Sequence, residues 1–224
     1  MLKFIKIAGT REAAEIISDR IFKELDAGKK VLWLLSGGGN ITIQVEAMKL
    51  LPEDLVQNLV IMFSDERYGS PGHKDSNYKQ LLDAGFSPGK ALLQPTLVEG
   101  DNSLFAARAR YGKVLDTAIN AADAVITQLG MGTDGHISGI LPHSAATTAT
   151  GIMFDYKSEE FDRITMTFES LRRSTVIYAF VFGAGKLEQL TKLHDQALPL
   201  DVQPAQFLKT MPESYVYNDQ IEGE

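Results

Sequence analysis

The sequence predicts an α/β protein with a three-layer, Rossmann-like fold, in which a mainly parallel open sheet carries helices on both faces. Short apolar runs alternate along the chain with segments whose apolar residues recur at helical spacing, which is typical of repeated strand–helix–strand units. Several of the runs are apolar throughout, as strands buried on both faces of a parallel sheet are. A chain of 224 residues fits one large domain, so we predict a single domain over residues 1–224.

The first half of the chain contains three expected strands and two helices. The first helix has an apolar face in which Ala13, Ile17, Ile21 and Leu25 follow one another at intervals of four residues, and Gly28 is well placed to end it. In order, we predict a strand over residues 4–7, this helix from Thr10, strands over 31–35 and 59–63, and between these two strands a helix over 41–51.

The second half continues the alternation. A long helix rich in alanine is expected over residues 102–122 and a buried strand over 124–129. Two further strands are expected over 164–168 and 176–182, and a helix opens at the Gly183–Lys186 loop and runs to about His194. Residues 142–151 contain mostly Ser, Thr and Ala, and we expect them to form a mobile loop that acts as a lid.

The composition restricts the compartment and the partners. The chain has no cysteine, which excludes disulfides, thiolate catalysis and cysteine-based zinc sites and fits a reducing, cytoplasmic location. No secretory signal is recognisable, and no apolar run reaches the roughly 20 residues that a membrane-spanning helix needs. The net charge of −7 argues against nucleic-acid binding, but it is compatible with a locally positive pocket for a phosphorylated small molecule.

Three of the predicted core strands end in loops rich in glycine or charged residues. These loops are residues 36–40, 65–78 and 130–136, and a fourth, 183–186, also joins a strand to a helix. In open parallel sheets, ligands bind outside the carboxyl ends of the strands. We therefore expect the loops to converge on one crevice.

The first loop reads Ser36-Gly37-Gly38-Gly39-Asn40. Its glycines bring backbone N–H groups close to an anion, and the following helix adds its positive end. A tight strand-to-helix turn explains a glycine run equally well. The dinucleotide-binding spacing Gly-x-Gly-x-x-Gly is absent, and the 183–186 loop lacks the spacing and the hydroxyl residue of a Walker loop.

The second and third loops carry the groups suited to acid–base chemistry. Arg67 offers a planar fork for phosphate or carboxylate, and Asp65 is able to hold a sugar hydroxyl or a neighbouring base. A solvated turn with internal ion pairs is the alternative for this loop. His136 suits proton transfer near neutral pH, and Asp134 is placed to fix its tautomer. No metal site is expected, because no ligands at recognisable spacing stand out.

In these loops the sequence resembles the 6-phosphogluconolactonase branch of the glucosamine-6-phosphate deaminase/6-phosphogluconolactonase superfamily, whose fold is of the NagB/RpiA type. Deaminases of this superfamily carry Tyr where Arg67 stands and a Glu where Leu141 stands, so the resemblance favours lactone hydrolysis. The sequence departs from the lactonase pattern at residues 39–41, where two hydroxyl donors and a proline are usual, and the stretch between Pro142 and Arg163 is short. The matching segments, in chain order, are residues 35–38, 65–78, 129–136, 163–168 and 183–186.

The resemblance implies hydrolysis of 6-phosphogluconolactone, or of a related phosphorylated sugar lactone, in the oxidative pentose phosphate pathway, with no metal or other cofactor. His136 is then the general base, Asp134 or Asp65 orients it or the substrate, and Arg67 stabilises negative charge. The expected partner is a small phosphorylated sugar rather than a nucleic acid or a membrane, and the protein is expected to be a monomer or a homodimer. The other implied contacts to the substrate and its phosphate are Ser36, Gly37, Gly38, Gly39, Asn40, Glu66, His73 and Lys186.

Two other functions stay open at this point. A glucosamine-6-phosphate deaminase or an aldose–ketose isomerase would need a second carboxylate that moves protons near His136, and Glu66 is the only nearby candidate in the sequence. A non-catalytic sugar-phosphate sensor would keep the pocket, and the altered first loop is its main support.

Overall fold

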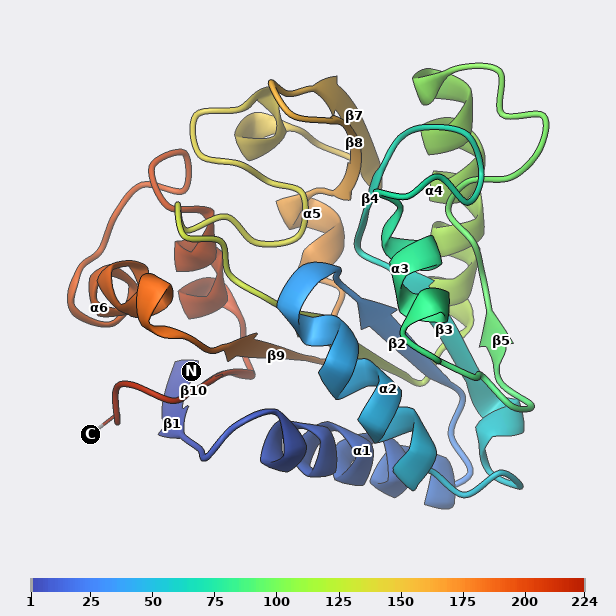
Figure 1. Ribbon diagram of the computed structural model, residues 1–224, viewed down its shortest axis with the longest axis horizontal. Helices are drawn as coiled ribbons and strands as arrows, with labels where there is room; N and C mark the ends of the chain where they lie inside the picture. The colour runs from blue at the N-terminus through green and yellow to red at the C-terminus, as the bar shows by residue number, and fades with distance from the viewer. Residues whose placement is uncertain (1, 224) are drawn as a thin grey trace.

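Figure 1 shows the computed structural model of the chain, which describes residues 2–223. In these residues the main sheet contains seven strands in the order β1-β10-β9-β6-β2-β3-β5, and all neighbouring pairs are parallel. The strands expected over 31–35, 59–63 and 124–129 are confirmed as neighbours, so their carboxyl ends open on one edge. The strands are β1 (Leu2–Lys6), β2 (Val31–Leu35), β3 (Leu59–Phe63), β5 (Leu92–Leu93), β6 (Ala124–Leu129), β9 (Val176–Val181) and β10 (Ser214–Asn218).

Helices cover both faces of this sheet, which confirms the predicted three-layer fold. Figure 1 shows α1 and α2 packed together on one side, with α4 and α6 on the other. No helix within residues 2–223 is long and apolar enough to cross a membrane. The helices on the first side are α1 (Thr10–Asp26), α2 (Ile41–Leu50) and α3 (Asn77–Asp83), and those on the second are α4 (Leu104–Ala121), α5 (Phe168–Leu171) and α6 (Leu187–Asp195). Short 3-10 helices lie at Gly38–Asn40, Val56–Asn58, Ala145–Thr148, Ala184–Lys186 and Pro204–Thr210.

A second, antiparallel sheet stands beside the carboxyl edge of the main one. It consists of β4 (Asp65–Arg67), β8 (Asp162–Met166) and β7 (Met153–Lys157) in the order β4-β8-β7. The strand expected over residues 164–168 belongs to this sheet and begins and ends two residues earlier than expected. Figure 1 shows this small sheet between α4 and the loops that follow the parallel strands.

Strand β2 shows why the parallel strands read as continuous apolar runs. Successive side chains of a strand point to opposite faces of its sheet. Leu32 and Leu34 belong to the hydrophobic core under α4, α5 and α6, whereas Val31, Trp33 and Leu35 belong to the core under α1, α2 and α3. Because both faces are covered, all five side chains are at most 1% exposed.

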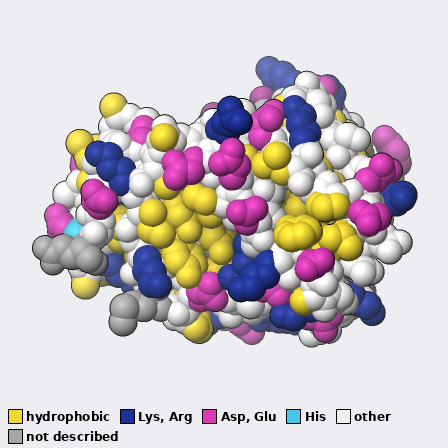
Figure 2. All heavy atoms as spheres, turned by 90° about the horizontal axis from the view of Figure 1, so that it is seen from below, with side chains coloured by type: hydrophobic (Ala, Val, Ile, Leu, Met, Phe, Trp, Pro, Cys, Tyr) yellow, Lys and Arg dark blue, Asp and Glu magenta, His cyan; other side chains and the backbone are white. Residues whose placement is uncertain are grey.

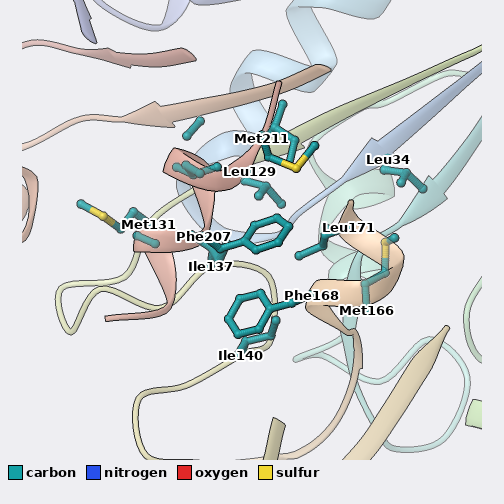
Figure 3. Close-up of a cluster of buried hydrophobic side chains, with 14 of the residues drawn as sticks. Leu34, Leu129, Met131, Ile137, Ile140, Met166, Phe168, Leu171, Phe207 and Met211 are labelled. Atoms are coloured by element: carbon teal, nitrogen blue, oxygen red, sulfur yellow. The ribbon is translucent and has the colours of Figure 1, made fainter. Parts of the chain in front are cut away.

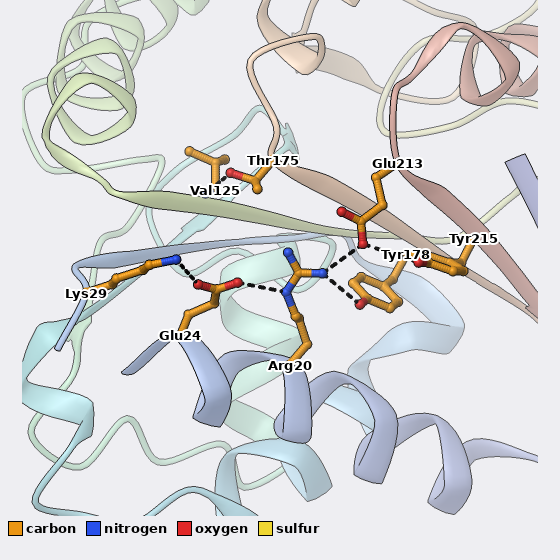
Figure 4. A network of polar contacts seen from close by, with 8 residues as sticks. All are labelled: Arg20, Glu24, Lys29, Val125, Thr175, Tyr178, Glu213 and Tyr215. Atoms are coloured by element: carbon orange, nitrogen blue, oxygen red, sulfur yellow. Dashed lines mark hydrogen bonds and ion pairs between the residues drawn. The ribbon is translucent and has the colours of Figure 1, made fainter. Parts of the chain in front are cut away.

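A polar network ties α1 to the β9–β10 side of the sheet (Figure 4). The Arg20 guanidinium, 18% exposed, contacts Glu24 at 3.0 Å and Glu213 at 2.8 Å. Lys29 reaches the other oxygen of Glu24 at 2.6 Å. The outer surface on the α1 side, seen in Figure 2, shows hydrophobic areas separated by charged side chains.

Tyr111 of α4 completes the hydrogen bonding of β3 where the neighbouring strand β5 ends. The two residues of β5 pair with Val60 and Ile61, so Phe63 lies beyond the end of β5. The buried Tyr111 hydroxyl accepts a hydrogen bond from the Phe63 N–H at 2.7 Å and donates one to the Phe63 carbonyl at 3.0 Å. The Tyr111 hydroxyl thus makes the two backbone hydrogen bonds that a longer β5 would make with Phe63.

We expect Tyr111→Phe to lower the free energy of unfolding by about 1–3 kcal/mol, because two buried backbone groups of Phe63 lose their partner. Denaturant unfolding followed by the fluorescence of Trp33, the single tryptophan, measures the change. Tyr215→Phe is the matched control, since its half-buried hydroxyl contacts the Glu213 carboxylate near the surface, and its loss should cost less than about 0.5 kcal/mol. Equal losses in the two variants would contradict the role given to Tyr111.

Candidate functional site

The loops that follow β2, β3, β6 and β9 line one cavity of about 530 Å³. This is the convergence expected from parallel strands whose carboxyl ends share an edge. Residues of the small antiparallel sheet close another side of the cavity. Of the expected site residues, those on the wall are Ser36, Gly37, Gly38, Gly39, Asn40, Asp65, Arg67, His136 and Lys186.

The first loop is locked to the second and third loops by close contacts. The Ser36 hydroxyl accepts a hydrogen bond from the backbone N–H of Gly130 at 3.1 Å. A Cβ atom on Gly37 would lie 1.9 Å from the side-chain oxygen of Asn77, so only glycine fits at this position. The three loops are therefore joined into one rim of the cavity. The Ser36 hydroxyl contributes to this rim through its hydrogen bond with Gly130.

The first loop presents backbone rather than side chains to the cavity. Residues 38–40 form a 3-10 turn that begins at Gly38, whose φ of 68° favours glycine, and α2 follows directly. The Asn40 amide is buried, donating to the carbonyl of Phe180 at 3.3 Å and accepting from Gln128 at 3.0 Å. Asn40 thus holds the ends of β6 and β9 together, while the glycines and the start of α2 face the cavity.

Strand β4 sends alternate side chains to opposite sides, and this places Asp65 and Arg67 on the cavity wall but not Glu66. The Glu66 carboxylate is 1% exposed and accepts hydrogen bonds from the backbone N–H groups of Arg67, Asn77 and Tyr78 at 2.8, 2.6 and 3.1 Å. It also accepts from the Ser76 hydroxyl at 3.0 Å. The expected substrate contact of Glu66 is corrected accordingly: this side chain caps α3.

His73 also lies away from the cavity wall, contrary to expectation. Its Nε2 is 2.8 Å from the carbonyl oxygen of Arg67. A Cβ atom on Gly69 would lie 2.8 Å from the His73 ring, so the ring fills the turn after β4. His73 therefore shapes the loop that carries Arg67 and does not reach a ligand in the cavity.

Asp65 is the buried carboxylate of the site. It is 5% exposed, and its oxygens lie 3.4 Å from the Ser64 hydroxyl and 3.4 Å from the Asn77 amide nitrogen. Burial raises the pKa of Asp65, although the charges of Arg67, Arg163 and His136 act in the opposite direction. A carboxyl group in this position accepts or shares a proton more readily than an exposed one.

His136 and Asp134 form a hydrogen-bonded pair. Nδ1 of His136 lies 2.7 Å from Oδ1 of Asp134, and the same oxygen accepts the backbone N–H of His136 at 3.1 Å. Burial works against ionisation of Asp134, but its hydrogen bond from His136 and the charge of that ring lower its pKa to about 2. The ionised carboxylate only accepts, so in the neutral imidazole Nδ1 carries the proton and Nε2 keeps its lone pair.

The loop around His136 is held from below by the hydrophobic core. Met131 and Ile137, on either side of the turn, are buried with Ile140, Phe168 and Phe207 (Figure 3). A Cβ atom on Gly132 would lie 2.1 Å from Nδ1 of His136 and 2.3 Å from Oδ1 of Asp134, so the pair needs glycine there. The histidine is therefore placed by packing and not by a flexible loop.

Three cationic side chains on the wall have no ion-pair partner within residues 2–223: Arg67, Arg163 and Lys186. Burial lowers the pKa of Lys186, while Asp134 raises it. Arg67 donates from Nη1 to the carbonyl of Asp75 at 2.9 Å, and its Nε is buried without a partner. Partly buried cations without carboxylate partners are suited to an anionic ligand.

Sequence reasoning missed Arg163, Ser138 and Phe161 as wall residues. Arg163 on β8 lies directly opposite Arg67 on β4, so their side chains share a face. Ser138 has a φ of 52°, and its hydroxyl donates to the carbonyl of Ser64 at 2.9 Å, which holds the third loop to the start of β4. Side chains alternate between the two faces of β8, and this alternation was the available signal for Arg163. The sequence does not show that β8 pairs with β4, so it could not tell which face points into the cavity.

The segment expected to act as a lid does not reach the cavity. None of residues 142–151, all of which are described, lies on the wall. The tip of the β7–β8 hairpin takes that position, since Glu160 and Phe161 line the cavity. Within residues 2–223, no group of three or more His, Asp or Glu side chains is arranged to hold a metal ion.

Residues 7–216 match the family described as glucosamine-6-phosphate isomerases/6-phosphogluconolactonase. The protein from Thermotoga maritima named 6-phosphogluconolactonase is 29% identical over 191 residues, which cover 83% of this chain and 84% of that protein. The protein of the same name from Mycobacterium tuberculosis is 28% identical over 191 residues, which cover 79% and 77%.

Solved structures share the fold at low sequence identity. A 6-phosphogluconolactonase from Shewanella baltica has a TM-score of 0.82 at 18% identity and matches over 97% of both chains. A monomeric glucosamine-6-phosphate deaminase has a TM-score of 0.77 at 20% identity, also over 97% of both chains. Because the family match spans nearly the whole chain and the fold agrees with it, this protein belongs to the glucosamine-6-phosphate isomerase/6-phosphogluconolactonase family.

Proposed function

We propose that the protein hydrolyses 6-phosphogluconolactone, or a related phosphorylated sugar lactone, to the free acid, as a step of the oxidative pentose phosphate pathway. The proposal rests on one observation: His136 lies on the wall of a cavity that also holds three cations without ion-pair partners among the described residues, and it is held by Asp134, which lies behind it and outside the wall. The relatives named 6-phosphogluconolactonase support the same reaction.

The phosphate lies at the end of the cavity formed by the first loop and Lys186. Backbone N–H groups of residues 37–39 and the positive N-terminus of α2 surround this end, and Lys186 adds a full charge. Anchoring the phosphate away from the reacting carbon orients the lactone ring over His136. The Ser36 hydroxyl is bonded to Gly130, and residues 37–40 carry no hydroxyl side chain, so the lysine is the main charged contact at this end.

The reaction proceeds by direct attack of water on the lactone carbonyl carbon. Nε2 of His136 takes a proton from the water as the new carbon–oxygen bond forms. Arg67 stabilises the negative oxygen of the tetrahedral intermediate, and Asp65 holds a sugar hydroxyl. The bond between the carbonyl carbon and the ring oxygen then breaks, and His136 returns the proton to that oxygen. Asp134 stays ionised throughout and stabilises the transient imidazolium.

The two alternative functions have less support. The deaminase alternative needed Glu66 to move protons, and this carboxylate is buried under four hydrogen bonds outside the cavity. A sensor has no need of a carboxylate-held histidine whose Nε2 is free among the described residues. Both observations favour lactone hydrolysis.

Supplying 6-phosphogluconolactone and glucosamine 6-phosphate separately tests the proposal. Acid release from the lactone should exceed the spontaneous rate, and no ammonia should form from the amino sugar. Ammonia release would establish the deaminase instead, and saturable binding of both compounds without turnover would establish the sensor.

We expect Lys186→Ala to raise KM for the phosphorylated lactone by roughly ten-fold or more with little change in kcat, because a charge-assisted hydrogen bond contributes about 1.5–3 kcal/mol. Steady-state kinetics measures the effect. Lys192→Ala is the matched control on the same segment, since Lys192 pairs at the surface with Glu188 at 2.7 Å and should leave KM unchanged. An unchanged KM in Lys186→Ala would remove the lysine from the phosphate site.

A further inference from the structure

The tip of the β7–β8 hairpin places one aromatic ring against two cavity arginines. The Phe161 ring centroid lies 5.2 Å from the guanidinium carbon of Arg67 and 5.6 Å from that of Arg163. All three side chains line the cavity. The ring therefore contacts the only two arginines on this wall of the described chain.

Arg67 and Arg163 need such a contact because they carry like charges directly opposite each other. They are cross-strand partners in the antiparallel β4–β8 pair, and like charges in this position destabilise a sheet. Neither arginine forms an ion pair within residues 2–223, and Arg163 is 6% exposed. The negative face of an aromatic ring attracts both guanidinium groups without neutralising them.

The hairpin tip is itself fixed by Ser158. The Ser158 hydroxyl donates to the carbonyl of Phe161 at 2.6 Å and accepts from its N–H at 3.2 Å. The same hydroxyl accepts from Nε of Arg163 at 3.3 Å. The tip thus holds Arg163 by a hydrogen bond and a ring contact, and it holds Arg67 by the ring.

The two arginines and Lys186 line the same cavity but come from loops that follow different strands of the main sheet. Lys186 follows β9 and Arg67 follows β3, and the strand order β9-β6-β2-β3 separates their loops by three strand spacings, which is roughly 14 Å. His136 follows β6 and the first loop follows β2, so both lie between Lys186 and the arginines. A ligand with one anionic group at Lys186 therefore extends past the histidine toward the arginines.

We propose that Phe161 is a positioning residue that holds Arg67 and Arg163 as a paired clamp for the carboxylate formed by lactone opening. This inference rests on the proposed function, since it assigns the second anionic end of the same ligand. The clamp places two positive guanidinium groups where the carbonyl oxygen becomes negative during the reaction. The same groups then bind the carboxylate of the product. The chemical class that it selects is a sugar acid with a phosphate at its far end.

Calorimetric binding of 6-phosphogluconate and of inorganic phosphate to the full chain tests the inference without turnover. In Phe161→Leu, which keeps an apolar side chain but removes the ring, the Kd for 6-phosphogluconate should rise about five-fold, equivalent to about 1 kcal/mol. The Kd for inorganic phosphate should stay within two-fold, because that ion binds at the Lys186 end. Phe161→Tyr keeps the ring and should restore product binding.

Phe105→Leu is the matched control. The Phe105 ring lies 4.6 Å from the guanidinium carbon of Arg108, is 62% exposed and is not part of the cavity wall, so its loss should change neither Kd. Unchanged product binding in Phe161→Leu, an equal loss in Phe161→Leu and Phe161→Tyr, or an equal loss for inorganic phosphate would each overturn the inference. Absence of detectable 6-phosphogluconate binding to the wild-type protein at millimolar ligand would overturn it as well. Failure of the proposed function is a separate result, because it would appear as no acid release from the lactone above the spontaneous rate.

Discussion

His136→Asn is expected to lower kcat for phosphorylated lactone hydrolysis by about 10²–10⁴-fold with a modest change in KM. Asparagine keeps a polar side chain but has no basic nitrogen that can take a proton from water near neutral pH. The imidazole is fixed by Asp134 at 2.7 Å, so its loss removes an oriented base and not a mobile one. Acid release in a weakly buffered solution with a pH indicator measures the rate.

The spontaneous hydrolysis of the lactone must be subtracted at each substrate concentration. His143→Asn is the matched control, because His143 is 70% exposed, lies outside the cavity wall and has a φ of 56° that asparagine tolerates. It should keep the wild-type kcat. A near-normal kcat in His136→Asn would remove this histidine from the mechanism.

Asp134→Asn is expected to lower kcat by a similar factor, about 10²–10⁴-fold, although it changes only one oxygen to nitrogen. The ionised Asp134 accepts a hydrogen bond from Nδ1 of His136, which leaves Nε2 of the neutral ring free for its proposed role as the base. An asparagine amide donates to Nδ1 instead, which moves the ring proton to Nε2 and blocks the attack on water.

Binding of 6-phosphogluconate separates this tautomer effect from misfolding. Asp134→Asn should bind the product within about two- to three-fold of wild type, since the proposed phosphate and carboxylate contacts do not involve Asp134. Histidine ring nitrogen shifts in NMR spectra report the tautomer directly and should show the proton on Nε2 in the variant. Wild-type kcat with a shifted tautomer would contradict the assignment of Nε2 as the base.

The fold was predictable where strands are buried on both faces. The bounds of β2, β3 and β6 coincide with the expected runs, because each run ends where glycines or charged side chains begin the next loop. The antiparallel sheet was not predictable in this way. β4 is the polar tripeptide Asp65–Arg67, and it forms a strand only because β8, about a hundred residues later, pairs with it. Such pairing leaves no local signal.

The sequence predicted which loops form the candidate site, but it did not predict which of their side chains face the cavity. A motif gives the position of Asp65, Glu66 and Arg67 in the chain, whereas the pleat of β4 decides that Glu66 points away from the other two. His73 likewise belongs to the motif and supports the turn. Arg163 enters the cavity through its pairing with Arg67, which single-sequence reasoning does not reach.

Acid release from 6-phosphogluconolactone by the wild-type chain is best compared with acid release from the same lactone without the phosphate. We expect saturable hydrolysis above the spontaneous rate, with kcat/KM at least ten-fold higher for the phosphorylated lactone because of the proposed contacts at Lys186 and the first loop. Hydrolysis no faster than in buffer, or equal rates for the two lactones, would contradict it.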